Sequence, residues 1–327
     1  MKMIPLGSTD IMLSRMGLGT WAIGGGPAWN GDLDQQICID TIVEAHRCGI
    51  NLIDTAPGYN FGNSEVIVGH ALKKLPRSEV VVETKCGIVW ERTGSLFNKV
   101  GDRQLYKNLT PESIREEVDA SLQRLGIDSI DIYMTHWQSV EPCFTPIAET
   151  VDTLNTLKKE GKIRSIGAAN VDTGHVREYL KHGELDIVQA KYSILDRALE
   201  AELLPLCQKH GIIVQVYSPL EQGLLTGTID RDYVPGGARA NKVWFQRDNM
   251  LRVIDMLEQW RPLCEKYRCT IPALALAWIL KQSDLITLLS GATAPEQVRE
   301  NVESLTISLT DDDSLLMRQM AEALDNK

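Results

Sequence analysis

The sequence predicts a closed (β/α)8 TIM barrel, and three observations support this α/β fold. Helix-like segments repeatedly end in a glycine that is followed at once by a β-branched apolar run. Eight such apolar runs have the length of strands, and the segments between them have helical spacing. The chain has 327 residues, within the roughly 200 to 400 residues usual for this barrel. We therefore expect one domain over residues 1–327.

The glycines mark helix ends in this pattern. A glycine just past a helix supplies the left-handed backbone of the C′ position, and a basic residue in the last turns suits the negative end of the helix dipole. The repeats, which include RCG-INLIDT, RLG-IDSIDIYMTH and KHG-IIVQVYSPL, occur at Gly49, Gly126, Gly161, Gly183 and Gly211. Five copies of one arrangement predict successive βα units.

The elements are expected in a simple order. Residues 1–15 contain a turn signal at Gly7 to Asp10 and predict a short hairpin across the bottom of the barrel. Thr110 followed by Pro111 predicts the start of one helix, whose apolar stripe consists of Ile114, Val118, Leu122 and Leu125. Strands are expected near residues 16–20, 51–54, 80–84, 130–135, 163–168, 186–190, 212–217 and 285–290.

The two longest irregular stretches, residues 86–109 and 218–247, follow the third and seventh of these strands. Long βα loops belong to the catalytic face of a barrel. We therefore expect a site at the carboxyl ends of the strands.

The composition disfavours several classes of partner and location. Lys plus Arg is 34 and Asp plus Glu is 44, so the net charge of −10 disfavours nucleic acids and acidic membranes as partners. No apolar run reaches the ~18 residues of a membrane span, and the N-terminus lacks a signal-peptide core, so a cytoplasmic location is expected. The seven cysteines, without a CxxC pair, are interpreted as reduced packing residues. No oligomeric state is predicted.

Three polar residues close or follow apolar runs at successive βα transitions. Asp54 closes the apolar run in LIDT. Lys85 is the last residue of VVVETK, and His136 is the last residue of IDIYMTH. Residues at the carboxyl ends of neighbouring barrel strands point into one mouth, so a charged Lys85 is expected beside Asp54 in a partly desolvated pocket.

Tyr59 follows five residues after Asp54 on a short loop that can turn its phenol over the same mouth. We expect a nearby ammonium to lower the tyrosine pKa from about 10 toward the working range. Such a tyrosine can protonate a carbonyl oxygen while hydride reaches the carbon, with His136 orienting that oxygen. Alone, each of these residues also fits a cap, a turn or barrel packing, and only their combination indicates catalysis.

One apparent dinucleotide-binding motif near the N-terminus is rejected. GLGTWA, residues 17–22, formally matches GxGxxA, but a Rossmann fingerprint must open a helix and Gly24-Gly25-Gly26-Pro27 follows almost immediately. The segment is better interpreted as the first βα loop, which carries Trp29 toward the mouth.

The chain resembles the aldo-keto reductase superfamily, specifically its bacterial NAD(P)-linked branch, over essentially its whole length. The matching runs are GLGTW, GINLIDTAPGYNFGNSEVIVG, ETK, DIYMTHW, GKIRSIGAAN, VQAKYS, YSPLEQGLLTG and SGATAPEQVREN. The resemblance implies NAD(P)H-dependent reduction of aldehydes and ketones without a metal. It also implies a catalytic tetrad of Asp54, Tyr59, Lys85 and His136, with Tyr59 as the general acid.

The same resemblance implies the cofactor contacts. Asn170 and Gln189 would fix the nicotinamide carboxamide, and Tyr217 would stack on the nicotinamide ring. The loop that begins with Ser218, Leu220 and Gly223 would hold the pyrophosphate, and Gln297 and Asn301 would meet the adenosine. Thr20, Trp21, Asp54, Gly291 and Thr293 complete the expected set.

Two departures from the family pattern matter. Ala169-Asn170 replaces the common Ser-Asn, so a hydroxyl contact is missing and weaker cofactor positioning is expected there. NADP-preferring relatives carry Lys or Arg after the last strand, where this chain has Gly291 to Pro295. A 2′-phosphate needs charge-assisted partners, so NADH is expected to be preferred over NADPH unless Arg299 or the loop of residues 231–247 substitutes.

The expected substrate pocket contains four tryptophans at or just after strand ends, Trp21, Trp29, Trp90 and Trp137. The resemblance makes small 2-oxoaldehydes such as methylglyoxal the first expectation and sugars or polyols the alternative, and the residue types alone do not separate the two. Two other classes stay open, a Schiff-base aldolase that uses Lys85 as nucleophile and a nicotinamide-binding regulatory subunit with little turnover.

Overall fold

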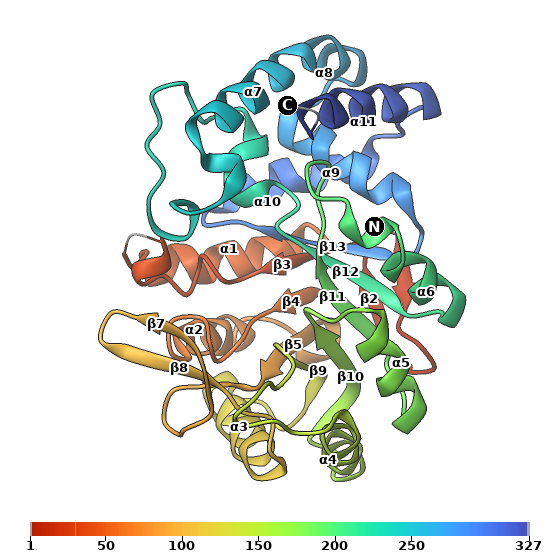
Figure 1. Cartoon of the computed structure of the whole chain (residues 1–327). Coiled ribbons are helices and arrows are strands. Elements are labelled where there is room, and N and C mark those ends of the chain that lie inside the picture. The colour runs from red at the N-terminus through yellow and green to blue at the C-terminus, as the bar shows by residue number, and fades with distance from the viewer. Residues whose placement is uncertain (1, 30, 326–327) are drawn as a thin grey trace.

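The computed structural model describes residues 2–29 and 31–325, in which eight parallel strands close into a barrel (Figure 1). Each strand pairs with the next in the chain, and β13 closes the ring on β3. The strands are β3 (Met16–Gly19), β4 (Leu52–Asp54), β5 (Val81–Cys86), β9 (Ile130–Thr135), β10 (Ile163–Ala169), β11 (Ile187–Lys191), β12 (Ile213–Tyr217) and β13 (Ile286–Gly291). The predicted fold and all eight predicted strands are confirmed.

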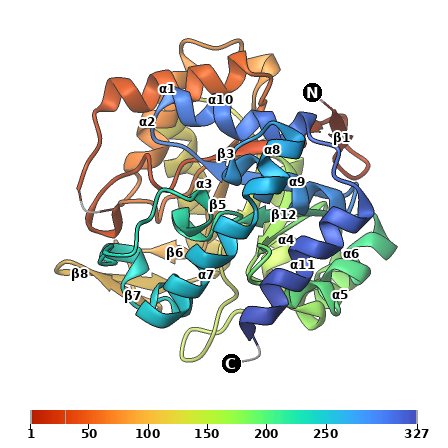
Figure 2. The ribbon, with the colours of Figure 1, turned by 90° about the horizontal axis from the view of Figure 1, so that it is seen from above.

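Helices surround the strands on the outside, as both views of the ribbon show (Figure 2). They are α1 (Gln35–Arg47), α2 (Asn63–Leu72), α3 (Pro111–Leu125), α4 (Ile147–Lys159), α5 (Thr173–His182), α6 (Leu203–His210), α7 (Arg247–Gln259), α8 (Arg261–Tyr267), α9 (Ile271–Gln282), α10 (Pro295–Glu303) and α11 (Asp311–Asp325). Short 3-10 turns are η1 (Pro27–Trp29), η2 (Arg77–Glu79), η3 (Ala198–Glu200), η4 (Glu221–Thr226), η5 (Gly237–Arg239), η6 (Val243–Phe245) and η7 (Ser304–Thr306). No helix of the described residues is long and apolar enough to cross a membrane.

Helix α3 shows how local sequence sets these elements. The Thr110 hydroxyl accepts a hydrogen bond from the Ser113 amide, and Pro111 occupies the first helical position. Ile114 and Val118 are fully buried against the barrel. The predicted start and apolar face of this helix are therefore confirmed.

The glycine pattern is confirmed at four of its five positions. Left-handed φ angles of 67° to 87° occur at Gly49, Gly126, Gly161 and Gly211. The prediction is wrong for Gly183, whose φ of 177° is extended backbone. A Cβ at Gly183 would lie 2.8 Å from Cγ1 of Val151 in α4, so close helix approach, not a left-handed turn, explains this glycine.

The N-terminal hairpin consists of β1 (Met3–Pro5) and β2 (Met12–Ser14), paired antiparallel with Ile4 opposite Leu13. These two side chains belong to one apolar cluster with residues at the beginnings of the barrel strands, including Leu52, Val81 and Ile213. The hairpin therefore closes the bottom of the barrel, as predicted, and leaves the opposite end as the mouth.

The stretch of residues 86–109 is not irregular, and this prediction is wrong. It contains β6 (Ile88–Val89), β7 (Ser95–Val100) and β8 (Arg103–Lys107), which form a three-stranded antiparallel sheet in the order β6-β8-β7. The hairpin turns at Gly101, whose φ is 59°. Its strands were hard to predict because β7 is mostly solvent-exposed and lacks an alternating apolar face.

Candidate active site

The four residues of the predicted tetrad meet at the mouth of the barrel. Asp54 is the last residue of β4, Lys85 lies near the end of β5, and His136 directly follows β9. The Lys85 ammonium forms an ion pair with the Asp54 carboxylate and donates hydrogen bonds to the Thr55 carbonyl at 3.0 Å and to the Tyr59 hydroxyl at 3.0 Å. The Tyr59 and His136 rings are 5.7 Å apart, edge to face. Four residues separated along the sequence therefore form one compact group.

Lys85 is fully buried, and its charge is set by its partners. Burial alone would lower the pKa of its ammonium, but its partners, above all the negative charge of Asp54, outweigh burial and raise that pKa above the ordinary lysine value. Lys85 is consequently a permanent cation at neutral pH, and it contacts the tyrosine hydroxyl directly.

The expected lowering of the Tyr59 pKa is wrong in direction. Burial and the charge of Asp54 raise the pKa of the phenol above its ordinary value, although Lys85 acts to lower it. The sequence suggested the ammonium but did not reveal how completely the hydroxyl is desolvated. A neutral phenol is the protonated form that a general acid requires.

His136 is a neutral imidazole at this mouth. Burial, and then the charge of Lys85, lower its pKa well below the ordinary histidine value. Its backbone is fixed because its amide donates to the Cys86 carbonyl and its carbonyl accepts from the Asn170 side chain. Its Nδ1 atom is buried without a hydrogen-bond partner among the described residues. A buried polar atom of this kind needs a partner that a ligand can supply.

A polar layer lies directly beneath the Asp54–Lys85 pair, and the sequence analysis missed it. The Gln189 amide nitrogen lies 2.9 Å from Asp54 Oδ1, 2.9 Å from Glu83 Oε1 and 2.7 Å from Gln215 Oε1. The available signal was Glu83, two residues before Lys85 and therefore on the same side of the strand.

Asn170 and Gln189, which were expected to bind the nicotinamide carboxamide, have different hydrogen-bond partners in the structure. The Tyr217 hydroxyl donates to the Asn170 side-chain oxygen at 2.8 Å, which joins the ends of β10 and β12. Gln189 instead turns its amide nitrogen toward the barrel interior. Thr20 is fully buried and uses its hydroxyl to contact the Asp54 carbonyl at 2.7 Å and Ser64, which are structural contacts.

The segment after β12 has unusual backbone geometry. Left-handed φ angles occur at Ser218 (54°), Glu221 (46°), Gln222 (54°) and Gly223 (98°). Turns of this kind orient backbone N–H groups around an anion. The Arg239 guanidinium donates to the Gln222 carbonyl at 2.8 Å and lies beside Gly223. The segment that includes Leu220, whose carbonyl accepts from the Gly223 amide, is therefore suited to a pyrophosphate.

The residues after β13 form a separate polar patch. The Gln297 side-chain oxygen accepts from the Thr293 amide at 2.8 Å, and Asn301 contacts the Gly291 carbonyl at 3.4 Å. Arg299 forms ion pairs with two carboxylates, Glu44 and Glu296. The alternative that Arg299 binds a 2′-phosphate therefore requires these pairs to break.

One of the four tryptophans, Trp21, lies beside the tetrad, and a second, Trp29, packs on it. Trp21 packs edge to face on Trp29 at 5.1 Å and lies 6.3 Å from the Tyr59 ring. Trp137 contacts Phe97 of β7, 5.7 Å between ring centres. Trp90 packs on Phe61 at 5.6 Å.

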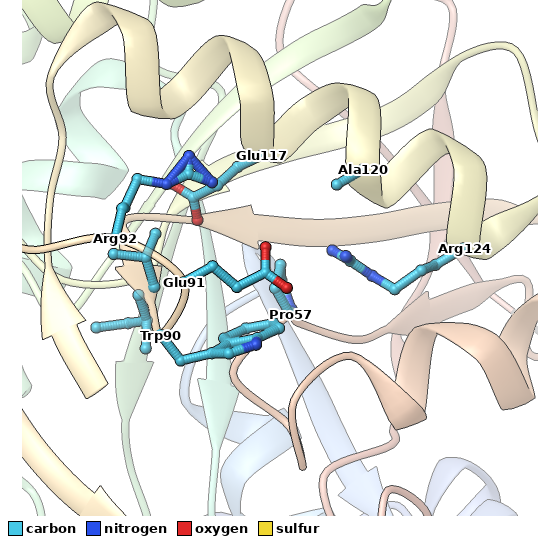
Figure 3. A pocket seen from close by; sticks show the side chains of 9 residues that line it. Pro57, Trp90, Glu91, Arg92, Glu117, Ala120 and Arg124 are labelled. Atoms are coloured by element: carbon cyan, nitrogen blue, oxygen red, sulfur yellow. The ribbon is translucent and has the colours of Figure 1, made fainter. Parts of the chain in front are cut away.

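Trp90 also lines a small cavity between the segment after β6 and helix α3 (Figure 3). The carboxyl group of Glu117 and the guanidinium groups of Arg92 and Arg124 belong to its walls, together with Pro57. None of the tetrad residues lines this cavity. Trp90 therefore lies at a cavity that the tetrad does not line, whereas Trp21 lies near Tyr59, and a substrate pocket that contains all four tryptophans stays a prediction.

Orphaned polar atoms test whether a dinucleotide fits this end of the barrel. Besides His136 Nδ1, the buried atoms without a partner among the described residues include Trp29 Nε1, Gln222 Oε1 and Ser290 Oγ. Gln222 belongs to the segment after β12, and Ser290 to the end of β13. The set contains a donor at Trp29, an acceptor at Gln222 and groups that can do either at Ser290 and His136. A dinucleotide and a carbonyl substrate together offer both kinds of partner, so these residues fit such ligands.

Comparison with known proteins decides the family. The model of the aldo/keto reductase family matches residues 15–322. The chain belongs to this family. It is 84% identical over 325 residues to the NADH-specific methylglyoxal reductase of Escherichia coli K12, with 99% of this chain and 100% of that protein covered.

Solved structures agree with this assignment. A glycerol dehydrogenase from Gluconobacter oxydans superposes with a TM-score of 0.89 at 34% identity and covers 99% of this chain and 96% of its own. An aldo-keto reductase from Klebsiella pneumoniae in complex with NADPH has a TM-score of 0.73 at 26% identity, with 98% and 95% covered. The barrel, the family and the resemblance seen in the sequence are thus consistent.

Proposed function

We propose that this aldo/keto reductase uses NADH to reduce small aldehydes and ketones, with methylglyoxal as the first substrate. The observation that carries the proposal is the Tyr59 hydroxyl, 3.0 Å from a fully buried Lys85 ammonium and next to a neutral His136. The 84% identical relative that is named an NADH-specific methylglyoxal reductase supports the choice of substrate and cofactor.

Each tetrad residue has a distinct chemical task in this proposal. The reduced nicotinamide, when bound, supplies a hydride to the carbonyl carbon. Tyr59 donates its proton to the carbonyl oxygen, and the Lys85 ammonium stabilises the phenolate that remains. Asp54 holds the ammonium in place, and the neutral His136 hydrogen-bonds the carbonyl oxygen and orients it.

The cofactor would be held by the rim of the barrel. Asn170 and Tyr217 are already hydrogen-bonded to each other at the ends of their strands, and the left-handed turns at Ser218 and Gly223 suit the pyrophosphate. Thr293 offers no positive charge to a 2′-phosphate, which favours NADH.

The substrate would lie against Trp21 and Trp29. Their rings supply apolar surface beside Tyr59, and the Trp29 indole N–H is buried without a partner among the described residues. A small dicarbonyl compound has a second oxygen that can accept such a hydrogen bond.

A spectrophotometric assay tests the proposal directly. NADH oxidation is followed with methylglyoxal, short aldehydes and open-chain sugars, each also tested with NADPH, and a separate glycerol arm follows the reduction of NAD⁺. We expect methylglyoxal with NADH to give the highest kcat/KM. Negligible carbonyl-dependent oxidation with every substrate, alongside tight NADH binding, would instead support a regulatory nicotinamide-binding subunit.

Polyol oxidation is the second candidate, because a solved relative at 34% identity is a glycerol dehydrogenase. The glycerol arm of the assay, run with NAD⁺, addresses it. A Schiff-base aldolase is disfavoured, since the nucleophile in that reaction is a neutral amine and the partners of Lys85 raise its pKa. Borohydride trapping with substrate alone should therefore leave Lys85 unlabelled.

A further inference from the structure

A second buried carboxyl group lies under the Asp54–Lys85 pair. Glu83 is fully buried on β5 and lies directly opposite Asp54 in the strand register. It comes two residues before Lys85, so both side chains are on the same side of the strand. Glu83 therefore faces the barrel interior, one layer below the reacting groups.

The Gln189 side-chain amide next to Glu83 has more hydrogen-bond acceptors around it than protons to donate. The Gln189 amide nitrogen is within 2.9 Å of three acceptors, one each on Asp54, Glu83 and Gln215. A primary amide has only two protons to donate. The Gln215 amide donates to the other Glu83 oxygen at 3.0 Å. A further proton on one of the carboxyl groups would satisfy the cluster.

The balance of charge among Asp54, Glu83 and Lys85 also favours an additional proton on one carboxyl group. Lys85 forms an ion pair with Asp54, whereas no Lys, Arg or His ion pair with Glu83 occurs in the described part of the chain. Two ionised carboxylates against one ammonium would leave an uncompensated buried negative charge, which is strongly unfavourable. Burial, followed by the charge of Asp54, raises the pKa of Glu83 well above its ordinary value.

We propose that Glu83 is a positioning residue that stays protonated at neutral pH, donates a hydrogen bond to the Asp54 carboxylate and leaves the Lys85 charge available to Tyr59. The proposal rests on the carbonyl reduction proposed above. If Glu83 were ionised, its negative charge would oppose the phenolate that forms when Tyr59 gives up its proton.

Two substitutions separate positioning from simple packing. Glu83→Gln keeps the shape, the neutrality and a donor, so kcat should stay within about threefold of wild type and the pH profile of kcat/KM should be unchanged near neutrality. Glu83→Ala removes the contact with Asp54. Its kcat should fall about ten- to a hundredfold, as expected for loss of a buried hydrogen bond to a charged group, while the NADH Kd stays within about twofold.

Infrared spectroscopy reports whether the Glu83 carboxyl group is protonated. The difference spectrum between wild type and Glu83→Gln at neutral pH should contain the carbonyl stretching band of a buried, protonated carboxylic acid. Glu117→Gln serves as the matched control, because Glu117 is a buried carboxyl whose hydrogen bonds go to Gly87 and Ser113 and not to Gln189 or Gln215. Its own band should be separate from that of Glu83.

The outcomes are distinguishable. A Glu83→Gln variant as inactive as Glu83→Ala, a difference spectrum without the acid band, or a folded Glu83→Ala variant with unchanged kcat would each overturn the proposal. If Glu83→Ala does not fold, Glu83→Gln and the spectrum still decide it. If the wild type reduces no carbonyl compound, the proposed function fails, while the infrared band still reports whether Glu83 is protonated.

Discussion

The hydroxyl of Tyr59 and the ammonium of Lys85 are hydrogen-bonded at 3.0 Å, and the ammonium also lies 4.8 Å from the centre of the tyrosine ring. The contact places a fixed positive charge at the oxygen that would lose a proton during carbonyl reduction. Because both groups are buried, this charge acts on the phenol with little screening by solvent.

Replacing the proton donor should stop reduction without releasing the cofactor. Tyr59→Phe keeps the ring beside Trp21 and His136 but removes the hydroxyl, so kcat should fall by at least about a hundredfold, the usual contribution of general acid catalysis. NADH affinity, measured by fluorescence titration, should change less than about twofold. Tyr106→Phe is the matched control, since that hydroxyl contacts only Gln104 among the described residues. Retained turnover in Tyr59→Phe would show that another group supplies the proton.

Removing Lys85 should affect stability as well as rate. Lys85→Met leaves the Asp54 carboxylate buried without its cation, which should lower the free energy of unfolding by about 3–5 kcal/mol. Adding Asp54→Asn removes the unpaired charge, so the double variant should recover much of this loss. Urea denaturation gives the stabilities, and both variants should be inactive. Equal stabilities for the single and double variants would argue against a strong buried ion pair.

Cofactor preference should respond to one residue after β13. Thr293→Arg introduces a cation where a 2′-phosphate is expected, and kcat/KM with NADPH should rise roughly ten- to a hundredfold. Thr293→Ala is the control for loss of the hydroxyl and should leave the preference for NADH in place. Steady-state kinetics with both cofactors checks this. A wild-type enzyme that already prefers NADPH would contradict the premise, and would direct attention to Arg299 breaking its pairs with Glu44 and Glu296.

The catalytic residues could be predicted from the sequence where a single residue stands out from its immediate neighbours. Asp54, Lys85 and His136 were found because a polar residue that closes an apolar strand is visible without knowledge of the fold. The barrel followed from the repeated glycines, and the structure confirms the strands that they predicted.

Other features depend on which strands become neighbours. The role of Glu83 arises from contacts with Gln189 and Gln215, which are 106 and 132 residues away in sequence. The direction of the Tyr59 pKa depends on complete burial, which one loop sequence does not encode. The β7–β8 hairpin was missed because solvent-exposed strands lack the apolar alternation on which strand prediction relies.

A second buried carboxyl group, that of Glu117, should make stability depend on pH. Glu117 of α3 accepts hydrogen bonds from the Gly87 amide at 3.0 and 3.1 Å and from Ser113 at 3.2 Å. Burial raises its pKa to about 8, above the ordinary value of 4.5. Because the folded pKa is the higher one, the protonated group stabilises the fold fully below about pH 4.5, and this contribution is lost as pH rises through about 8.

Glu117→Gln removes that titration and should therefore become more stable than wild type as pH rises. We expect no advantage near pH 4.5, and an advantage on the order of 2 kcal/mol at pH 7 to 8, because each unit of pKa difference corresponds to about 1.4 kcal/mol and part of this is offset by a weaker contact to Gly87. Thermal unfolding at several pH values measures the difference, with the exposed Glu112→Gln on the same helix as control. A gap between Glu117→Gln and wild type that does not change with pH would mean that Glu117 is ionised in the folded protein, held by its two contacts with the Gly87 amide and by the nearby Arg92.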